Sequence, residues 1–242
     1  MNNKYDLTEF EQGLQELGIS LEQSQIDAFM RYYELLIEWN SFMNLTAIIE
    51  FKEVCIKHFL DSLSLIKVMD CYQSLTLIDI GTGAGFPGIP LKIAFPELKI
   101  TLLDSLGKRV KFLNEVINQL GLKDIEAIHG RAEDFAKPSE LREAFDVCVS
   151  RAVANLATLS EYCLPYVKVG GSFISYKSEK ITEERQLAEK AITILGGQID
   201  SQNEFMLPFS DIYRNLFVIK KLKQTPKKYP RKAGLPSKEP LA

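Results

Sequence analysis

The sequence contains few of the residues that hold a domain together covalently or through metal ions. Only four of its 242 residues are cysteines, and Cys55, Cys71, Cys148 and Cys163 are scattered without a C-x-x-C pair. This spacing argues against a zinc site and a disulfide framework, because both depend on clustered or regularly spaced cysteines. We therefore expect reduced, half-buried thiols and a protein without a metal.

Long apolar runs are also missing. No stretch approaches the roughly 18 uninterrupted apolar residues that a membrane-spanning helix requires, and the first residues lack the apolar segment of a secretion signal. Internal repeats are absent too. With 46% apolar residues, the chain can bury one substantial core or two small ones. These features predict a compact cytoplasmic enzyme, expected to be a monomer, without a membrane partner.

Acidic residues are scarce at one end only. From position 220 onward the chain has eight lysines and arginines against the single acid Glu239, a net charge of +7, which leaves −10 for the first 219 residues. Such a segment favours phosphate contact, since bound cations release counterions from nucleic acid. A solvated, disordered tail that aids solubility is the alternative. The candidate RNA contacts of the tail are Lys227, Lys228, Arg231 and Lys232.

The dinucleotide fingerprint G-x-G-x-x-G is missing as well, although a glycine-rich loop is present. Residues 77–80 form an apolar run typical of a buried parallel strand, and position 86, where the fingerprint requires glycine, holds Phe86. Glycines directly after a strand let the backbone turn sharply and approach a ligand closely, so the loop predicts a nucleotide-like cofactor. The loop glycines are Gly81, Gly83, Gly85 and Gly88.

A carboxylate stands at the distance that a nucleotide site requires. The apolar run 100–103 ends in Asp104, 21 residues after Gly83, where a carboxylate can accept hydrogen bonds from a ribose diol. The alternative is that the glycines form only a tight turn between a strand and a helix, and that Asp104 caps the next helix.

The residue patterns divide the chain into a helical front and an α/β core. The first 70 residues are predicted to be helical, with helices starting near Thr8 and Ser20 at capping-box spacing and a third helix over about 51–69. From Leu75 strands and helices alternate, which predicts a mostly parallel sheet with helices on both faces. We expect a cap over 1–70, a core over 71–223 and a basic tail over 224–242, together one compact domain.

The individual elements of the core follow from the same patterns. Strands are expected at 75–80, 99–104, 125–129, 145–150, 171–176, 203–207 and 214–222. Helices are expected after Gly88 and at about 108–120, 156–168 and 182–195, with stop signals at Gly121, Gly170-Gly171 and Gly196-Gly197.

Ligands of open α/β sheets lie beyond the carboxyl ends of the strands, so residues just after each strand are candidates for chemistry. After the third strand, Ala132 and Glu133 could recognise the amino group and ring nitrogen of an adenine. After the fourth, Ser150-Arg151-Ala152 would face a transferable group. Glu133 and Arg151 could instead form an ordinary surface ion pair.

Two long motifs resemble the bacterial small-subunit rRNA methyltransferase G family. They are DIGTGAGFPGIP from Asp79 to Pro90 and LDSLGKRV from Leu103 to Val110, and shorter matches extend the resemblance over nearly the whole chain. The resemblance implies a class I methyltransferase with a Rossmann-like, mostly parallel seven-stranded sheet and an N-terminal helical cap. It also implies S-adenosylmethionine-dependent methylation of guanine N7 in the 530 loop of 16S rRNA, at position 527 in usual rRNA numbering. The shorter matches are Trp39-Asn40, Asn44-Leu45-Thr46, His58–Ser62 and Ser150–Ala152.

The resemblance also implies roles for individual residues. Cofactor contacts of the family fall on Gly81, Phe86, Ala132, Glu133 and Arg151, and Asp104 takes the ribose role of the wider methyltransferase class. Gly83 and Gly85 complete the predicted loop. Relatives often carry leucine in place of Phe86, and only some branches share the extended basic end, so that end is not indispensable to the chemistry.

Methylation at guanine N7 needs no proton removed, because neutral guanine carries a lone pair there; in-line placement matters most. We therefore expect no general base, and neither His58 nor His129 is assigned that role. His58 and Asp61 are interpreted as a structural pair. An acidic or carbonyl-lined pocket, with Asp61 or Asn44, is hypothesised to tolerate the charge on the alkylated ring.

The target guanine is expected in a loop or flipped out, because N7 lies in the deep, narrow groove of an RNA helix. Lys108, Arg109 and Lys111 are candidate phosphate contacts, or else a solvated helix face.

Two other functions stay open from the residues alone. An NAD(P)-dependent oxidoreductase is disfavoured by Phe86 and by the absence of a second mononucleotide half. A non-catalytic rRNA-binding assembly factor would keep only a vestigial cofactor pocket.

Overall fold

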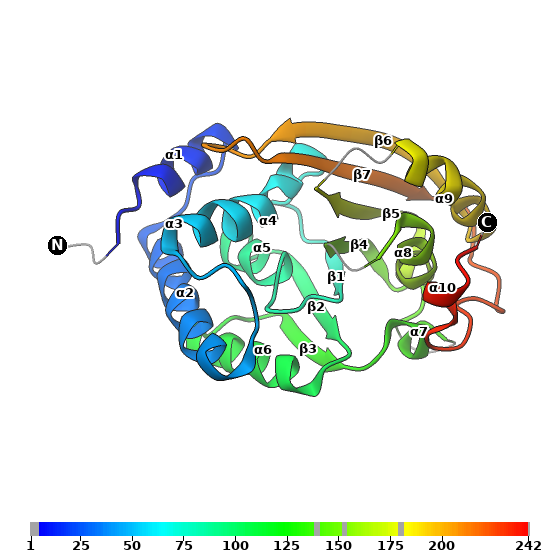
Figure 1. The fold of residues 1–242 in the computed structure, drawn as a ribbon, viewed down its shortest axis with the longest axis horizontal. Helices are drawn as coiled ribbons and strands as arrows, with labels where there is room; N and C mark the ends of the chain where they lie inside the picture. The colour runs from blue at the N-terminus through cyan, green and yellow to red at the C-terminus, as the bar shows by residue number, and fades with distance from the viewer. Residues whose placement is uncertain (1–4, 138–140, 152–153, 179–181, 242) are drawn as a thin grey trace.

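A seven-stranded sheet forms the centre of the computed structural model, which describes residues 5–137, 141–151, 154–178 and 182–241 (Figure 1). The strand order is β3-β2-β1-β4-β5-β7-β6, and β7 is antiparallel to both of its neighbours. The predicted fold class is confirmed, and each predicted strand is present. The strands are β1 (Thr76–Ile80), β2 (Lys99–Asp104), β3 (Ile125–His129), β4 (Phe145–Arg151), β5 (Val167–Lys177), β6 (Gly197–Met206) and β7 (Tyr213–Lys221).

Alternate residues of the central strands enter two separate apolar cores, one on each face of the sheet. Leu77 and Val149 belong to one core, whereas their neighbours Ile78 and Cys148 belong to the other. Helices of the front cover the first face, with α5 (Gly88–Ala94) and α6 (Gly107–Leu120), and the second face carries α8 (Leu156–Cys163) and α9 (Thr182–Ile194) (Figure 1). This double burial explains why the strands are nearly continuous apolar runs.

The helical front shares its core with the sheet. Phe10 of α1 (Thr8–Glu16), Phe29 of α2 (Gln23–Met43) and Phe59 pack in one cluster with Leu77 of β1. The predicted third helix is a single helical segment that changes pitch: α3 (Phe51–Val54), the π-helical turn η1 (Cys55–Leu60), α4 (Asp61–Leu63) and the 3-10 turn η2 (Ser64–Lys67). Such π-helical turns often occur at functional sites.

The predicted capping boxes are wrong, although the helices exist. Thr8 is already inside α1, and α2 is capped by Glu22, whose backbone N–H donates to Gln25 Oε1 at 2.8 Å. The Gln25 amide also donates to the carbonyls of Ile93 and Ala94 at the end of α5. Packing against α5 therefore selects this cap over Ser20 and Gln23.

Gly170-Gly171 does not end a helix, contrary to the prediction. Helix α8 stops at Cys163, a short 3-10 turn η3 (Leu164–Tyr166) follows, and Val167 already pairs with Phe145 in the sheet. A side chain at Gly171 would place its Cβ 2.5 Å from the Asp146 carbonyl oxygen, where the register between β4 and β5 shifts. The glycines thus accommodate a bulge within β5.

The basic tail packs against the core, so a solvated tail does not describe it. Tyr229, Pro230 and Pro236 are buried, and the short helix α10 (Leu235–Lys238) lies beside α8, near α7 (Ala132–Phe135) (Figure 1).

Candidate active site

The glycine loop turns over the end of β1 in a conformation that requires glycine. Gly81, Gly83 and Gly85 have φ angles of +72°, +64° and +97°, which residues with a side chain rarely adopt. A Cβ at Gly85 would also lie 2.8 Å from the hydroxyl of Tyr32. That buried hydroxyl donates to the Ala84 carbonyl, so α2 holds the loop from behind.

Asp79 joins the two ends of the loop from inside the sheet. Its Oδ2 accepts hydrogen bonds from Thr82 Oγ1 at 2.6 Å and from the Gly88 N–H at 2.9 Å. Burial raises the pKa of this carboxyl group to about 6. The two ends of the loop are therefore held together by one buried carboxylate.

Asp104 lies at the end of β2, directly beside the loop. Its Oδ2 accepts from the Gly83 N–H at 2.9 Å and lies 3.4 Å from Arg109 Nη1, while Oδ1 accepts from the Leu106 N–H at 2.9 Å. The last contact is with the N–H of Leu106, the residue before the first turn of α6, so Asp104 does not cap this helix as the alternative had it. A carboxylate offers about four acceptor positions, which leaves capacity for a ligand.

A cavity of about 510 Å³ opens over this loop. It brings together the predicted residues Gly81, Gly83, Phe86, Asp104 and Arg151, although they come from different strand ends. The predicted Gly85 does not line it. The lining residues are Leu45, Thr46, His58, Gly81–Ala84, Phe86, Asp104–Leu106, Arg109 and Arg151.

A second cavity, of about 260 Å³, continues past the ends of β2 and β3. Gly81 and Ser105 line both cavities, and Ala132 and Glu133 lie in the second, where the sequence predicts adenine contacts. Glu133 is 5% exposed. The lining also includes Tyr162 of α8 and, from the basic tail, Gly234 and Ser237, none of which was predicted.

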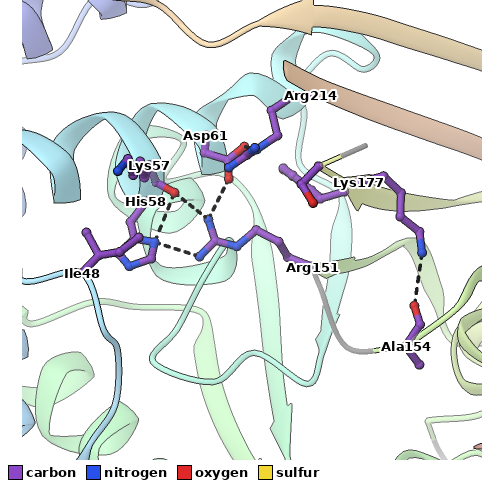
Figure 2. A pocket seen from close by; sticks show the side chains of 10 residues that line it. Ile48, Lys57, His58, Asp61, Arg151, Ala154, Lys177 and Arg214 are labelled. Atoms are coloured by element: carbon purple, nitrogen blue, oxygen red, sulfur yellow. Dashed lines mark hydrogen bonds and ion pairs between the residues drawn. The ribbon is translucent and has the colours of Figure 1, made fainter. Parts of the chain in front are cut away.

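A third cavity, of about 600 Å³, lies on the other side of Arg151 and His58 (Figure 2). Side chains of Lys57, Arg151, Lys177 and Arg214 surround it, with Asp61 as the acidic member. Lys57 is also paired with Glu53 and Lys177 with Glu184, so the four cations face three acids and a small positive net charge is left for contact with a polyanion.

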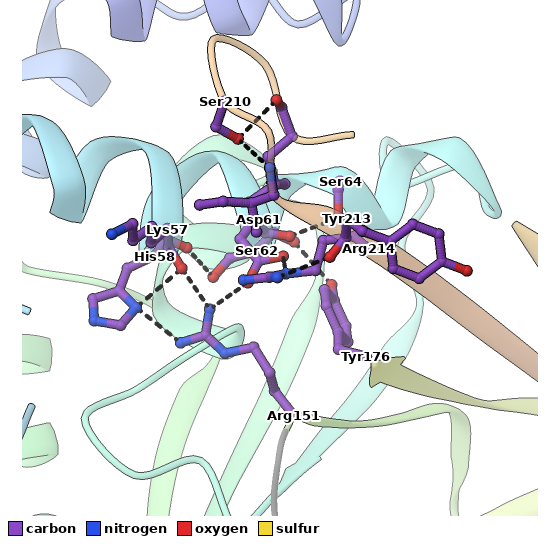
Figure 3. Close-up of polar contacts among 12 residues, drawn as sticks. Lys57, His58, Asp61, Ser62, Ser64, Arg151, Tyr176, Ser210, Tyr213 and Arg214 are labelled. Carbon is purple, nitrogen blue, oxygen red and sulfur yellow. Dashed lines mark hydrogen bonds and ion pairs between the residues drawn. The ribbon is translucent and has the colours of Figure 1, made fainter. Parts of the chain in front are cut away.

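Asp61 connects the two arginines of the third cavity (Figure 3). Its Oδ2 is 3.1 Å from Arg151 Nη1 and its Oδ1 is 2.9 Å from Arg214 Nε, while its side chain is 2% exposed. Both oxygens therefore face guanidinium groups. Arg151 is also held over the Phe86 ring, with 5.1 Å between the guanidinium carbon and the ring centroid.

His58 stacks on Phe86, and both of its ring nitrogens have polar neighbours. Nδ1 lies 3.2 Å from Arg151 Nη2, a donor, and 3.1 Å from the Lys57 carbonyl oxygen, an acceptor, while Nε2 lies 3.0 Å from Thr46 Oγ1. Burial, reinforced by the nearby Arg151 charge, lowers the pKa of His58 to about 3. A ring with so low a pKa is a weak base.

The remaining predicted site residues lie outside the cavities. Asn44 is exposed at the end of α2 in a left-handed conformation. Lys111 is exposed on α6, whereas Lys108 Nζ donates to the Met43 carbonyl. Ala152 lies outside the described residues.

The predicted RNA contacts of the tail divide into two groups. Lys227, Lys228 and Lys232 are exposed, whereas Arg231 forms a bidentate pair with the buried Glu161.

Arg214 and Lys177 were missed because they lie near the ends of the antiparallel pair β5 and β7, where no sequence motif marks a ligand site. Across the residues that the structure describes, no cluster of three or more metal-ligating side chains occurs. Within the same residues, no helix is long and apolar enough to cross a membrane.

The sheet order, the loop after β1 and the carboxylate after β2 define a class I, Rossmann-like methyltransferase. Solved structures agree on the fold. An S-adenosylmethionine-dependent methyltransferase from Aquifex aeolicus superposes with a TM-score of 0.51 at 18% identity, over 70% of this chain and 93% of its own. TrmN from Thermus thermophilus superposes with a TM-score of 0.52 at 16% identity, over 67% of this chain and 48% of its own.

Sequence comparison narrows the class to one family. Residues 25–212 match the family model GidB, rRNA small subunit methyltransferase G, and the chain belongs to this family. A ribosomal RNA small subunit methyltransferase G from Lachnoclostridium phytofermentans is 59% identical over 98% of both chains. The protein of that name from Geobacillus thermodenitrificans is 48% identical over 98% of this chain and 99% of its own.

Proposed function

We propose that this protein transfers the methyl group of S-adenosylmethionine to N7 of a guanine in the 530 loop of 16S rRNA, at position 527. The observation that carries the proposal is one run of three neighbouring cavities. A cofactor-sized part is walled by Gly81, Asp104 and Glu133, and it meets a cationic part at Arg151 and His58. The meeting point of the two parts is where a methyl group would pass.

We place the cofactor across the first two cavities, with its adenine in the second. Adenine would occupy the cavity of Ala132 and Glu133, the ribose diol would reach the remaining acceptor capacity of Asp104, and the methionine part would follow the loop of Gly81, Gly83 and Phe86. This order leaves the sulfonium methyl near Arg151 and the third cavity.

The RNA would enter through the third cavity. Arg151, Arg214, Lys57 and Lys177 supply the cations that phosphates flanking a flipped guanine require. Because both Asp61 oxygens face arginines, we assign Asp61 to positioning of Arg151 and Arg214 rather than to the methylated ring. Lone-pair attack by N7 then depends on placement, which can supply about 7–11 kcal/mol in favourable cases.

Methylation of small subunits tests the proposal directly. Purified protein would receive radiolabelled S-adenosylmethionine and small subunits from a strain lacking the protein, and N7 modification would be mapped by strand cleavage. We expect label in 16S rRNA within the 530 loop. Label elsewhere, or none in 16S rRNA, contradicts the proposal.

Asp104→Ala separates an enzyme from an assembly factor. We expect it to abolish saturable S-adenosylmethionine binding and methyl transfer, while Glu189→Ala on the exposed face of α9 leaves both unchanged. Ribosomal association that requires neither Asp104 nor cofactor, together with no methyl transfer by the unaltered protein, would favour the assembly factor. Saturable nicotinamide binding without S-adenosylmethionine binding would favour the oxidoreductase.

A further inference from the structure

The C-terminal segment, defined here as residues 231–239, is held on α8 by a buried ion pair. The Glu161 side chain is 1% exposed, and its two oxygens accept from Arg231 Nε at 2.9 Å and Arg231 Nη2 at 2.7 Å. The Arg231 backbone N–H donates to the same carboxylate at 2.8 Å. A buried charge without its partner is costly, so this pair fixes the start of the segment.

Two further hydrogen bonds set the path of the segment. Arg231 Nη2 also donates to the Glu239 carbonyl at 2.7 Å, which folds the segment back on itself. Thr158 Oγ1, on α8, donates to the carbonyl of the buried Pro236 at 3.0 Å. The segment is therefore seated along α8, beside the adenine cavity.

Gly234 connects the segment to Glu133. Its N–H donates to Glu133 Oε1 at 2.7 Å, and its φ of +81° explains why a glycine stands there. Gly234 and Ser237 line the same cavity as Ala132. A residue 101 positions further along the chain thus holds this carboxylate by one of its two oxygens.

We infer that the C-terminal segment is a cofactor-binding element that forms the outer wall of the adenine site. The inference rests on the proposed S-adenosylmethionine chemistry and adds to it. Glu133 recognises the adenine only when Gly234 holds it, and Ser237 limits the space available to the base. Arg231 serves this wall from inside, whereas the exposed Lys227, Lys228 and Lys232 stay available for phosphate.

Ser237→Trp tests the wall by filling the adenine site. Calorimetry with S-adenosylmethionine should show a Kd raised at least about tenfold, while Lys238→Trp, the neighbouring exposed position on α10, stays within about twofold of the unaltered chain. A chain ending at Lys232 keeps the Arg231–Glu161 pair and should also bind about tenfold more weakly.

Hydrogen exchange on the unaltered chain supplies a measurement that needs no variant. Exchange of the amides in 231–239 should slow when S-adenosylmethionine is added. Unchanged exchange, or equal affinities for the unaltered chain, Ser237→Trp and the shortened chain, overturns the inference and leaves the proposed function intact. Absence of saturable S-adenosylmethionine binding by the unaltered chain overturns both.

Discussion

Asp61→Asn removes the negative charge that joins Arg151 and Arg214. The asparagine keeps the shape and one carbonyl oxygen, so one guanidinium retains an acceptor, but the new amide group turns two donors toward the other. Breaking a buried ion pair by removing one partner costs about 3–5 kcal/mol. Because the arginine side chains are 15% and 16% exposed and keep some hydration, we expect a smaller loss of about 2–3 kcal/mol.

Thermal and urea denaturation measure this loss. In a domain of this size, 1 kcal/mol shifts Tm by about 2–4 °C, so Asp61→Asn should lower Tm by about 4–12 °C. Methyl transfer to small subunits should fall as well, because Arg151 and Arg214 lose their common orientation. Asp211→Asn, an exposed acid in the turn before β7, is the matched control and should change neither quantity.

A double-mutant cycle distinguishes the interaction between Asp61 and Arg214 from general effects of the substitutions on stability. Asp61→Ala and Arg214→Ala should show a coupling energy of at least about 1 kcal/mol, since neighbouring charges in one network do not act independently. An unchanged Tm for Asp61→Asn, or additive effects of the two alanine variants, would refute the positioning role assigned to Asp61.

Three further predictions follow from the site. Burial lowers the pKa of His58 from 6.5 to about 3, so between these pH values the unfolded chain binds a proton that the folded chain does not. The free energy of unfolding should therefore fall as the pH drops from about 6.5 toward 3. His58→Gln should flatten this slope by up to about 1.4 kcal/mol per pH unit, measured by urea titrations at several pH values. Gly85→Ala should destabilise the fold by about 1–3 kcal/mol, since its φ of +97° and the contact with Tyr32 both oppose a side chain, and a Tm within 1 °C of the unaltered protein would contradict this. Replacing Lys227, Lys228 and Lys232 together by alanine should weaken RNA binding and reduce the salt dependence of its Kd, whereas an unchanged salt slope would exclude these lysines as phosphate contacts.

Local sequence patterns were sufficient to predict the sheet and the glycine loop. Both faces of the sheet are covered, so β1 and β2 are nearly continuous apolar runs, and such runs can be recognised from neighbouring residues alone. Gly81, Gly83 and Gly85 were recognisable because a positive φ is a property of single residues. Asp104 followed from its distance along the chain, since one strand-helix-strand unit has a nearly constant length.

Contacts between distant residues were decided only by the tertiary structure. Gly170-Gly171 has the composition of a helix stop, yet it lies in the bulged strand β5, where the Asp146 carbonyl leaves no room for a side chain at Gly171. Arg214 reaches Asp61 over 153 positions, and Gly234 reaches Glu133 over 101. Such pairs leave no periodicity or spacing in the sequence, because the distance between two side chains in space is set by how the elements pack and not by their separation along the chain.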